Sequence, residues 1–174
     1  MASPSDSAPG SGHHANDAAT ARCLVLVASD TRTLQSDEAG ALVAERLTTA
    51  GYDVAAREIV SDDRHAIRIR VLRAVEDEQV ELIIIAGGTG LTRRDVTPEA
   101  VGPLLNRTLP GFGEAFRRLS QEEIGIDGLM SRAFAGVAAG SVIFALPGSK
   151  GGCRTAMDAL ILPMLPHLLG LCRT

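Results

Sequence analysis

The fold is decided by residues 80–100, which read VELIIIAGGTGLTRRDVTPEA. The apolar run 80–86 predicts a strand that is buried on both faces, as strands of a parallel sheet are. The glycine-rich loop 87–90 lets the chain turn sharply after it. Thr97 followed by Pro98 predicts the start of a helix, with Thr97 as N-cap, whose free amides face back toward the loop. Strand, loop and helix together form the basic unit of an α/β protein.

The residues before this unit repeat the same alternation. Residues 23–28 form a continuous apolar run and predict another buried strand. Residues 36–50 carry apolar side chains at helical spacing, and Gly51 supplies the left-handed cap of that helix. A further strand is expected at 53–60, and Ser61 is expected to cap the next helix. The alternating order predicts an α/β sandwich around a mostly parallel sheet.

The residues after this unit predict a helix, a hairpin and a last helix. Residues 113–123 favour a helix, and residues 136–146 favour a β-hairpin that ends in an apolar strand. The last helix is expected at 155–171, where Pro163 and Pro166 predict a kink or a break into two pieces. In sheets of this type, ligands bind beyond the carboxyl ends of the parallel strands. The loops after the strands are therefore the candidate site.

Length and composition exclude several classes of protein. The 174 residues predict one domain, residues 21–174, after a disordered tail at 1–20 that holds no large apolar residue after Met1. A net charge of −4 argues against nucleic acid as a partner. We find no signal peptide and no stretch long enough to span a bilayer, which argues against a membrane partner. Three widely spaced cysteines without a CxxC pair favour a reduced, cytoplasmic setting.

The loop 87–90 is followed by residues that can bind phosphate and metal. Its backbone amides and the Thr89 hydroxyl can cradle an anion, although the loop is neither a Walker A motif nor GxGxxG. Arg93 and Arg94 can clamp phosphate oxygens, and Asp95 beside a polyphosphate can hold Mg²⁺. The alternative is a surface ion pair with a helix cap.

A second pair of carboxylates, Asp62 and Asp63, lies where the helix after residue 60 begins. Either of them could converge with Asp95 on a metal ion. Equally, both could compensate the helix dipole from the first turn. The sequence leaves open which of the two points into the site.

A second glycine-rich loop, residues 146–152, reads LPGSKGG and also follows an apolar strand. It contains Lys150, the single lysine among 17 basic residues, which suggests a point-charge contact to an anion, although chance placement explains it equally well. Ser131 and Arg132 precede the expected hairpin. They are either another anion contact or an ordinary exposed pair.

Three of these motifs together resemble one known family. The runs GGTGLTRRDVTPEA at 87–100, SRAFAG at 131–136 and LPGS at 146–149 are similar to those of the MogA/MoaB-type molybdopterin adenylyltransferases of molybdenum cofactor biosynthesis. The run GFGEAFRRLSQEEIG at 111–125 resembles the MoaB-type branch, and the resemblance covers roughly residues 22–172. It implies a three-layer α/β/α fold and a homotrimer or hexamer. It also implies Mg²⁺-dependent transfer of AMP from ATP to the terminal phosphate of molybdopterin, with release of pyrophosphate.

The resemblance also assigns roles to single residues. It implies that Asp62 and Asp95 are the catalytic residues and hold the metal, with Asp63 as the alternative to Asp62. The residues that it places at the nucleotide and its phosphates are Gly87, Gly88, Thr89, Gly90, Arg94, Ser29 and Asp30. The residues that it places at molybdopterin are Ser131, Arg132, Gly148, Ser149 and Lys150. The chain departs from the family pattern at Lys150, where a proline is usual, at Ser61, where a proline is also usual, and at residues 126–130.

Two other functions remain open at this stage. The same fold could hold molybdopterin or a nucleotide without turnover, or the chain could act as an interaction module through its acidic surface and its tail. The presence of both Asp62 and Asp95 favours the enzyme. The leucine-rich last helix favours an oligomer, although it could simply cover the sheet.

Overall fold

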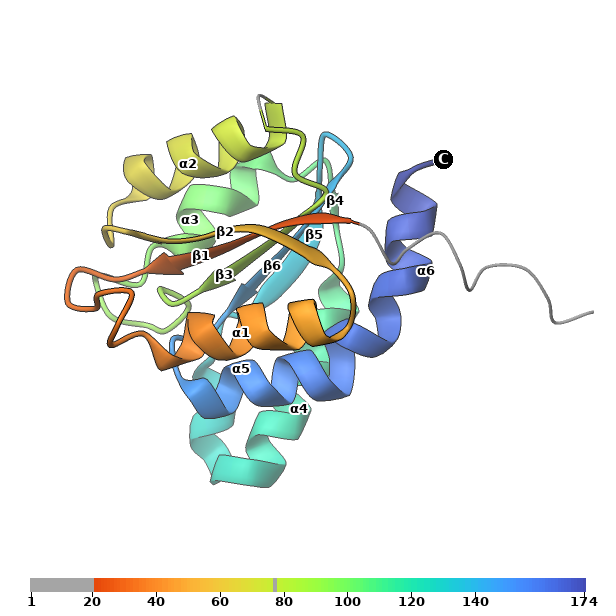
Figure 1. Ribbon diagram of the computed structural model, residues 1–174. Helices are drawn as coiled ribbons and strands as arrows, with labels where there is room; N and C mark the ends of the chain where they lie inside the picture. The colour runs from red at the N-terminus through yellow and green to blue at the C-terminus, as the bar shows by residue number, and fades with distance from the viewer. Residues whose placement is uncertain (1–20, 77) are drawn as a thin grey trace, which may run out of the picture.

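The computed structural model describes residues 21–76 and 78–174. The expected disordered tail at 1–20 lies outside the described residues. In the described part, helices cover both faces of a central sheet, so the chain has the three α/β/α layers that the resemblance implies (Figure 1).

Among the described residues the sheet has six strands, in the spatial order β2-β1-β3-β6-β5-β4. Strands β2, β1, β3 and β6 run parallel to one another, whereas β5 is antiparallel to β6 and to β4. The strands are β1 Arg22–Ala28, β2 Asp53–Val60, β3 Leu82–Ala86, β4 Arg107–Thr108, β5 Phe134–Ala138 and β6 Ser141–Leu146. The mostly parallel sheet and the hairpin, here β5 and β6, are confirmed.

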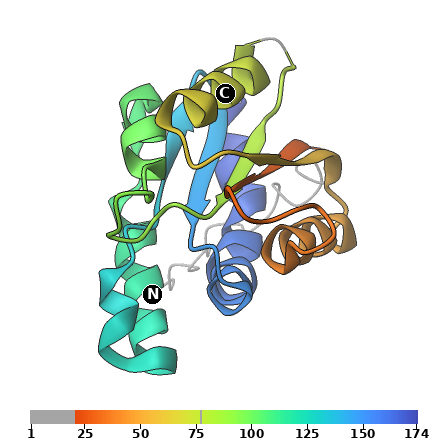
Figure 2. The same ribbon diagram turned by 90° about the vertical axis from the view of Figure 1, so that its left-hand side faces the viewer.

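Each face of the sheet has its own apolar core. Successive side chains of a strand point to opposite faces; Val25 and Val27 of β1 therefore enter one core, and Leu24 and Leu26 enter the other. The first core is covered by α1 Glu38–Thr49, α4 Pro110–Ile124, α5 Lys150–Ala156 and α6 Leu162–Cys172. The second core is covered by α2 Arg64–Glu76 and α3 Thr97–Val101, on the opposite side of the sheet (Figure 2).

The start of α2 corrects one expectation and answers an open question. Ser61 does not cap this helix. Instead, Oδ1 of Asp63 accepts hydrogen bonds from the amides of His65 and Ala66, at 2.9 and 2.8 Å. Asp63 thereby satisfies amides that the first turn leaves without helical partners. Its carboxylate is used as a cap, so Asp62 is the member of the pair that remains for a site.

The last helix begins earlier than expected. It starts at Lys150 because Oγ of Ser149 accepts a hydrogen bond from the amide of Gly152, at 3.2 Å. Lys150 is therefore a helical residue and not part of the preceding loop. The expected break is a π-helical turn, Met157–Ile161, between α5 and α6. The wider turn lies directly before Pro163, where a proline ring would crowd the regular helix.

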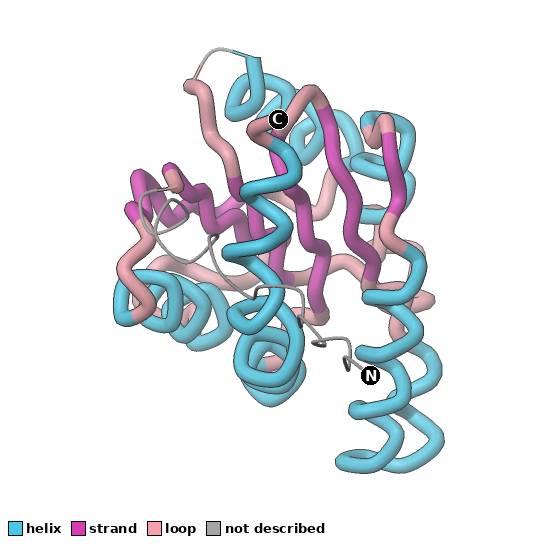
Figure 3. The backbone as a smooth tube through the Cα atoms, turned by 90° about the vertical axis from the view of Figure 1, so that its right-hand side faces the viewer, coloured by secondary structure: helices cyan, strands magenta, loops and turns pink. Residues whose placement is uncertain are grey.

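The expectation that no stretch is long enough to span a bilayer is wrong by length and composition alone, because among the described residues Lys150–Cys172 is long and apolar enough to cross a membrane. Its buried side chains, Met157, Ile161, Leu165 and Leu169 among them, belong to the core on one face of the sheet. Figure 3 shows α6 lying along that face. The segment therefore serves as a core helix in this fold.

Three other boundaries differ from the sequence prediction. Strand β3 starts at Leu82 and not at residue 80, helix α4 starts at Pro110 and not at residue 113, and β5 starts at Phe134 and not at residue 136. The two-residue strand β4 was not expected. It is too short for a period-two pattern, and its pairing with Gly136 and Val137 is visible only in three dimensions.

Candidate active site

A cavity of about 1030 Å³ opens at the carboxyl edge of the sheet. The ends of β1, β3 and β6 contribute Ala28, Ala86 and the loop after Leu146 to its lining. This is where open parallel sheets bind ligands, because the loops after adjacent strands converge there. The two glycine-rich loops meet at this edge: the amide of Gly87 donates to the carbonyl oxygen of Leu146, at 2.9 Å.

The first glycine-rich loop has a backbone that requires glycine. Gly87 and Gly88 have φ angles of +107° and +68°, which side chains rarely adopt. A Cβ on Gly88 would lie 2.3 Å from Oγ1 of Thr97. That hydroxyl is buried and donates to the carbonyl oxygen of Gly87, at 2.9 Å. Thr97 thus begins α3 as expected, but its side chain fastens the loop and does not cap the helix.

Asp95 lines the cavity and is held by donors from its own loop. Its Oδ2 accepts hydrogen bonds from the amide and the hydroxyl of Thr92, at 2.8 and 2.7 Å. Partial burial opposes ionisation, but the hydrogen bonds from Thr92 and the amide of Gly90, together with the charge of Arg132, outweigh it and lower the pKa of Asp95. Asp95 is therefore a preformed carboxylate.

Asp62 lines the same cavity in a different environment. Its Oδ2 accepts from the amide of Asp30 at 3.3 Å, and Oδ1 of Asp30 accepts from the amide of Asp62 at 3.0 Å. Burial raises the pKa of Asp62, and the negative charges of Asp30 and Asp95 raise it further, against the lowering effect of the Asp30 amide. A cation bound here would relieve this repulsion.

Three further polar residues line the cavity. Ser29 and Arg94 were both expected from the sequence, whereas Asp30 is not among the lining residues and its carboxylate accepts from the amide of Asp62. Oγ of Ser29 accepts from the amides of Thr31 and Arg32, each at 3.2 Å, and so orders the turn after β1. Arg32 also lines the cavity and was not expected. Its only signal in the sequence is its place directly after the first strand turn.

The second glycine-rich loop contributes fewer of its expected residues. Gly148 and Ser149 line the cavity, and a Cβ on Gly148 would lie 3.4 Å from Cα of Gly87. Lys150 is not among the lining residues, and its ammonium lies 3.7 Å from the carboxylate of Glu38 on α1. The expected contact of Lys150 with an anion stays a prediction.

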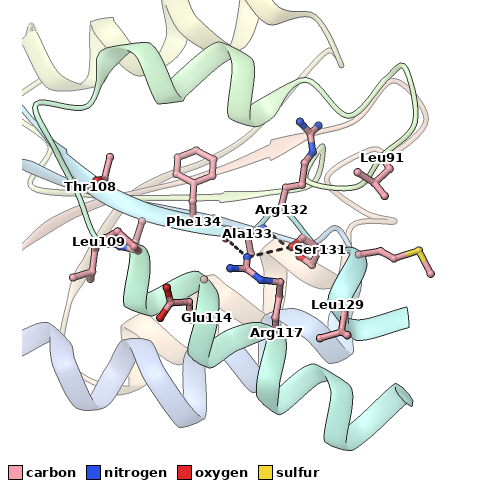
Figure 4. Close-up of a pocket in the computed structure, with 14 residues that line it drawn as sticks. Leu91, Thr108, Leu109, Glu114, Arg117, Leu129, Ser131, Arg132, Ala133 and Phe134 are labelled. Atoms are coloured by element: carbon pink, nitrogen blue, oxygen red, sulfur yellow. Dashed lines mark hydrogen bonds between the residues drawn. The ribbon is translucent and has the colours of Figure 1, made fainter. Parts of the chain in front are cut away.

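Ser131 and Arg132 lie between two cavities. Ser131 lines both the large cavity and a neighbouring one of about 510 Å³, whereas Arg132 lines only the smaller one. In Figure 4 the guanidinium of Arg117 points to the carbonyl oxygens of Ser131 and Ala133, and its Nη1 donates to both at 3.4 Å. Arg117 thus fixes the segment that carries Ser131 and Arg132.

One wall of the large cavity was not expected. It is formed by the end of α4 and by the following 3-10 helix, Gly125–Met130. The wall residues include Phe116, Ser120, Glu123, Asp127 and Met130. Both oxygens of Glu123 accept from the hydroxyl of Thr155 on α5, at 2.7 and 2.8 Å. The amphipathic pattern predicts α4 as a helix, but not which part of it faces a ligand.

The carboxylates in the cavity suit a divalent metal ion that is bound partly by the protein and partly by a substrate. Among the described residues no group of three or more His, Cys, Asp and Glu side chains is arranged to hold an ion. Asp62 and Asp95 nevertheless bring two carboxylates to one cavity. Mg²⁺ is commonly bound in this way, by one or two carboxylates with water and substrate phosphates.

The fold and this cavity define an α/β protein of the molybdopterin-binding class: residues 24–167 match the family described as a probable molybdopterin binding domain. Two relatives carry the name molybdenum cofactor biosynthesis protein B. The protein of Bacillus subtilis (strain 168) is 47% identical over 149 residues, which cover 85% of this chain and 88% of the relative. The protein of Escherichia coli (strain K12) is 44% identical over 144 residues, with 83% and 85% covered. The chain belongs to this family of molybdenum cofactor biosynthesis proteins, in its MoaB branch.

Solved structures agree with this assignment. A crystal structure of molybdenum cofactor biosynthesis protein B matches with a TM-score of 0.84 and 44% identity, covering 88% of this chain and 96% of the other. The tungsten cofactor synthesizing protein MoaB from Pyrococcus furiosus matches with a TM-score of 0.79 and 34% identity, covering 89% and 98%. The α/β fold expected from the sequence is thus confirmed.

Proposed function

We propose that the protein transfers AMP from ATP to the terminal phosphate of molybdopterin, with Mg²⁺ and with release of pyrophosphate. The observation that carries this proposal is the convergence of Asp62 and Asp95, from two separate loops, on one cavity beside a glycine-rich loop. A site for two phosphate-bearing substrates must offset their mutual repulsion. Two carboxylates that can share a cation, next to a loop that can present amides to phosphate, meet that need.

The residues of this chain would act by binding and positioning. Loop 87–90 would hold the nucleotide phosphates, while Arg94 and Arg32 would stabilise the charge that develops on the departing pyrophosphate. Ser131, Gly148 and Ser149 would contact molybdopterin. The phosphate of molybdopterin forms the new bond to the α-phosphorus of ATP as the bond to pyrophosphate breaks, so no side chain has to act as a nucleophile.

The metal would be held by Asp62 and Asp95. When bound, it supplies charge neutralisation at the phosphate oxygens, which is worth several kcal/mol in metal-assisted reactions, or at least about a hundredfold in rate. The low pKa of Asp95 keeps one ligand ionised without metal. A bound cation would relieve the negative charge of Asp30 and Asp95, which together with burial raises the pKa of Asp62.

The test is release of pyrophosphate from Mg-ATP in the presence of purified molybdopterin. Asp95→Asn should reduce turnover by roughly a hundredfold or more, because it removes one metal ligand. Asp63→Asn is the matched control, because Asp63 caps α2 and asparagine is an equally good cap. Tight molybdopterin binding without turnover in the wild type would instead support the carrier of the same fold.

We also propose that the chain forms a homo-oligomer, a trimer or a hexamer, with a second copy covering an exposed apolar surface. Five large apolar side chains are exposed on and beside the 3-10 helix that follows α4: Leu91, Ile124, Ile126, Leu129 and Met130. Leu91, Leu129 and Met130 line the smaller cavity, and Figure 4 shows Leu91 and Leu129 there. Exposed apolar patches of this kind often mark protein interfaces.

Light scattering behind size exclusion tests the oligomer. Ile126→Asp should shift the protein toward the monomer, whereas Ile69→Asp, at an exposed apolar position on α2, should not. A monomeric wild type would contradict the proposal.

We propose a cytoplasmic location, because among the described residues Cys23, Cys153 and Cys172 are all free thiols.

A further inference from the structure

Arg132 makes an unusual set of contacts with the first glycine-rich loop. Its Nε donates to the carbonyl oxygen of Gly90 at 2.8 Å, its Nη2 donates to the carbonyl oxygen of Asp95, and its Nη1 pairs with the carboxylate of Glu99. Its own amide donates to the carbonyl oxygen of Thr89, at 2.8 Å. One residue, more than thirty positions away in the sequence, thus binds the end of the loop at Thr89 and Gly90 and the segment that follows it at Asp95 and Glu99.

These contacts place Arg132 behind the loop. Gly90 and Asp95 line the large cavity, but Arg132 does not. In a trans peptide the carbonyl group and the following amide point in opposite directions. The carbonyl groups of Thr89 and Gly90 accept hydrogen bonds from Arg132, so the amides of Gly90 and Leu91 point the other way. The amide of Gly90 donates to the carboxylate of Asp95. Gly90 and Leu91 are both lining residues of the cavity.

We propose that Arg132 is a positioning residue, whose guanidinium fastens the segment from Gly90 to Glu99 and sets the Leu91 amide and Asp95 for the nucleotide phosphates without contacting either substrate. The inference rests on the proposed function and changes the role that the resemblance implies for Arg132, from a molybdopterin ligand to a support for the nucleotide side. Its planar fork suits this task, because it serves several carbonyl oxygens at once, which a lysine ammonium does less well.

The experiment compares three variants of the full chain. Arg132→Gln removes the charge and most of the fork, and Arg132→Lys keeps the charge. Arg68→Gln is the matched control, because Arg68 also donates to two carbonyl oxygens of the same helix region, those of Ala100 and Glu99, each at 2.9 Å. Calorimetry measures the Kd for Mg-ATP, steady-state rates give a separate KM for ATP and for molybdopterin, and thermal unfolding reports folding.

Arg132→Gln should raise the Kd for Mg-ATP and the KM for ATP by about ten- to a hundredfold, the usual loss for a residue that supports a binding group. The KM for molybdopterin should not change. Arg132→Lys should recover part of the loss, and Arg68→Gln should bind Mg-ATP like the wild type. If Arg132→Gln is unfolded, the intermediate effect of Arg132→Lys, measured at an unchanged Tm, takes its place.

Three results would overturn the inference: an unchanged Kd for Mg-ATP in Arg132→Gln and in Arg132→Lys, a rise confined to the KM for molybdopterin, or an equal loss in Arg68→Gln. An unchanged Kd, or an equal loss in Arg68→Gln, would show that Arg132 has no special role. A rise confined to the KM for molybdopterin would show that Arg132 contacts molybdopterin directly. If Mg-ATP binding depends on Arg132 as expected but the wild-type protein releases no pyrophosphate, the proposed function is refuted and this inference is kept. Wild-type protein that binds no Mg-ATP would overturn both.

Discussion

The two glycine-rich loops occupy equivalent places in the fold but are built differently. Each follows a buried parallel strand, β3 or β6, and each leads into a helix, α3 or α5. The first has two glycines with positive φ and is fastened by Thr97, by Asp95 and by the distant Arg132. The second is held mainly by a helix cap at Ser149.

The second loop has one glycine, Gly151, that is free for substitution. A Cβ on Gly151 would meet nothing within 4 Å, whereas one on Gly87 would lie 2.4 Å from the carbonyl oxygen of Ala28. The thiol of Cys153 donates to the carbonyl oxygen of Pro147 at 3.2 Å. Burial, with the charge of Asp37, raises its pKa to about 12, so that it stays a donor. The difference suggests that the first loop is shaped for a ligand and the second is a regular helix start beside it.

Gly88→Ala should have a larger effect than any single change in the second loop. Alanine would be strained at this positive φ, and its Cβ would collide with Oγ1 of Thr97. Strain of this kind costs about 1–3 kcal/mol and the collision adds to it. We expect a clear decrease in Tm, measured by thermal unfolding, and a clear increase in the Kd for Mg-ATP, measured by calorimetry.

Gly151→Ala is the matched control for this change. Alanine at this position of α5 has space and a better helix propensity, so Tm should stay the same or rise slightly. An equal decrease in Tm in Gly88→Ala and Gly151→Ala would show that the two loops do not differ in their need for glycine.

Thr97→Val should have the next largest effect. Valine keeps the shape of the side chain but removes the donor to Gly87, and it leaves that carbonyl oxygen without this partner. A buried group that loses its partner costs about 1–3 kcal/mol. Chemical denaturation should show this loss of stability, and the Kd for Mg-ATP should rise with it. A stable variant whose Kd is unchanged would show that the loop keeps its form without Thr97.

The sequence predicts the fold well because the evidence for it is local. Apolar runs at 23–28 and in 80–86 define β1 and β3, and the alternation with helices defines a parallel sheet. The same holds for the first loop, whose glycines, Asp95 and Thr97 are adjacent in the chain. The resemblance points to Asp62, with Asp63 as its alternative, and only the hydrogen bonds of Asp63 show which carboxylate caps the helix.

The parts that could not be predicted depend on contacts between distant residues. The role of Arg132 is visible only when its guanidinium is seen among carbonyl groups from another loop. Lys150 attracts attention as the single lysine, but its nearest charged partner lies on α1, more than a hundred residues earlier. The wall that contains Glu123 and Asp127 depends on where the end of α4 passes the cavity. No local pattern contains that information.

Ser149→Ala should have a moderate effect. It removes the cap of α5 while leaving the backbone of the second loop in place. Loss of a serine cap costs about 1 kcal/mol, which is less than the cost expected at Gly88. Thermal unfolding should show a small drop in Tm, and Mg-ATP binding should persist. Loss of Mg-ATP binding without a change in Tm would show that Ser149 contacts the nucleotide and not molybdopterin.

Lys150→Gln should have the smallest effect. The ion pair with Glu38 spans 3.7 Å between half-exposed side chains, and exposed pairs contribute about 0–1 kcal/mol. We therefore expect an unchanged Tm within about 1 °C or 2 °C and a KM for molybdopterin within about threefold of the wild type, since 0.7 kcal/mol corresponds to roughly that factor. Glu38→Gln is the matched control, because it breaks the same pair and leaves the lysine free. A KM that rises tenfold in Lys150→Gln but not in Glu38→Gln would show that Lys150 turns from Glu38 to the anion of the substrate. Lys150 would then join Gly148 and Ser149 in binding molybdopterin, and the second loop would be more than a regular helix start.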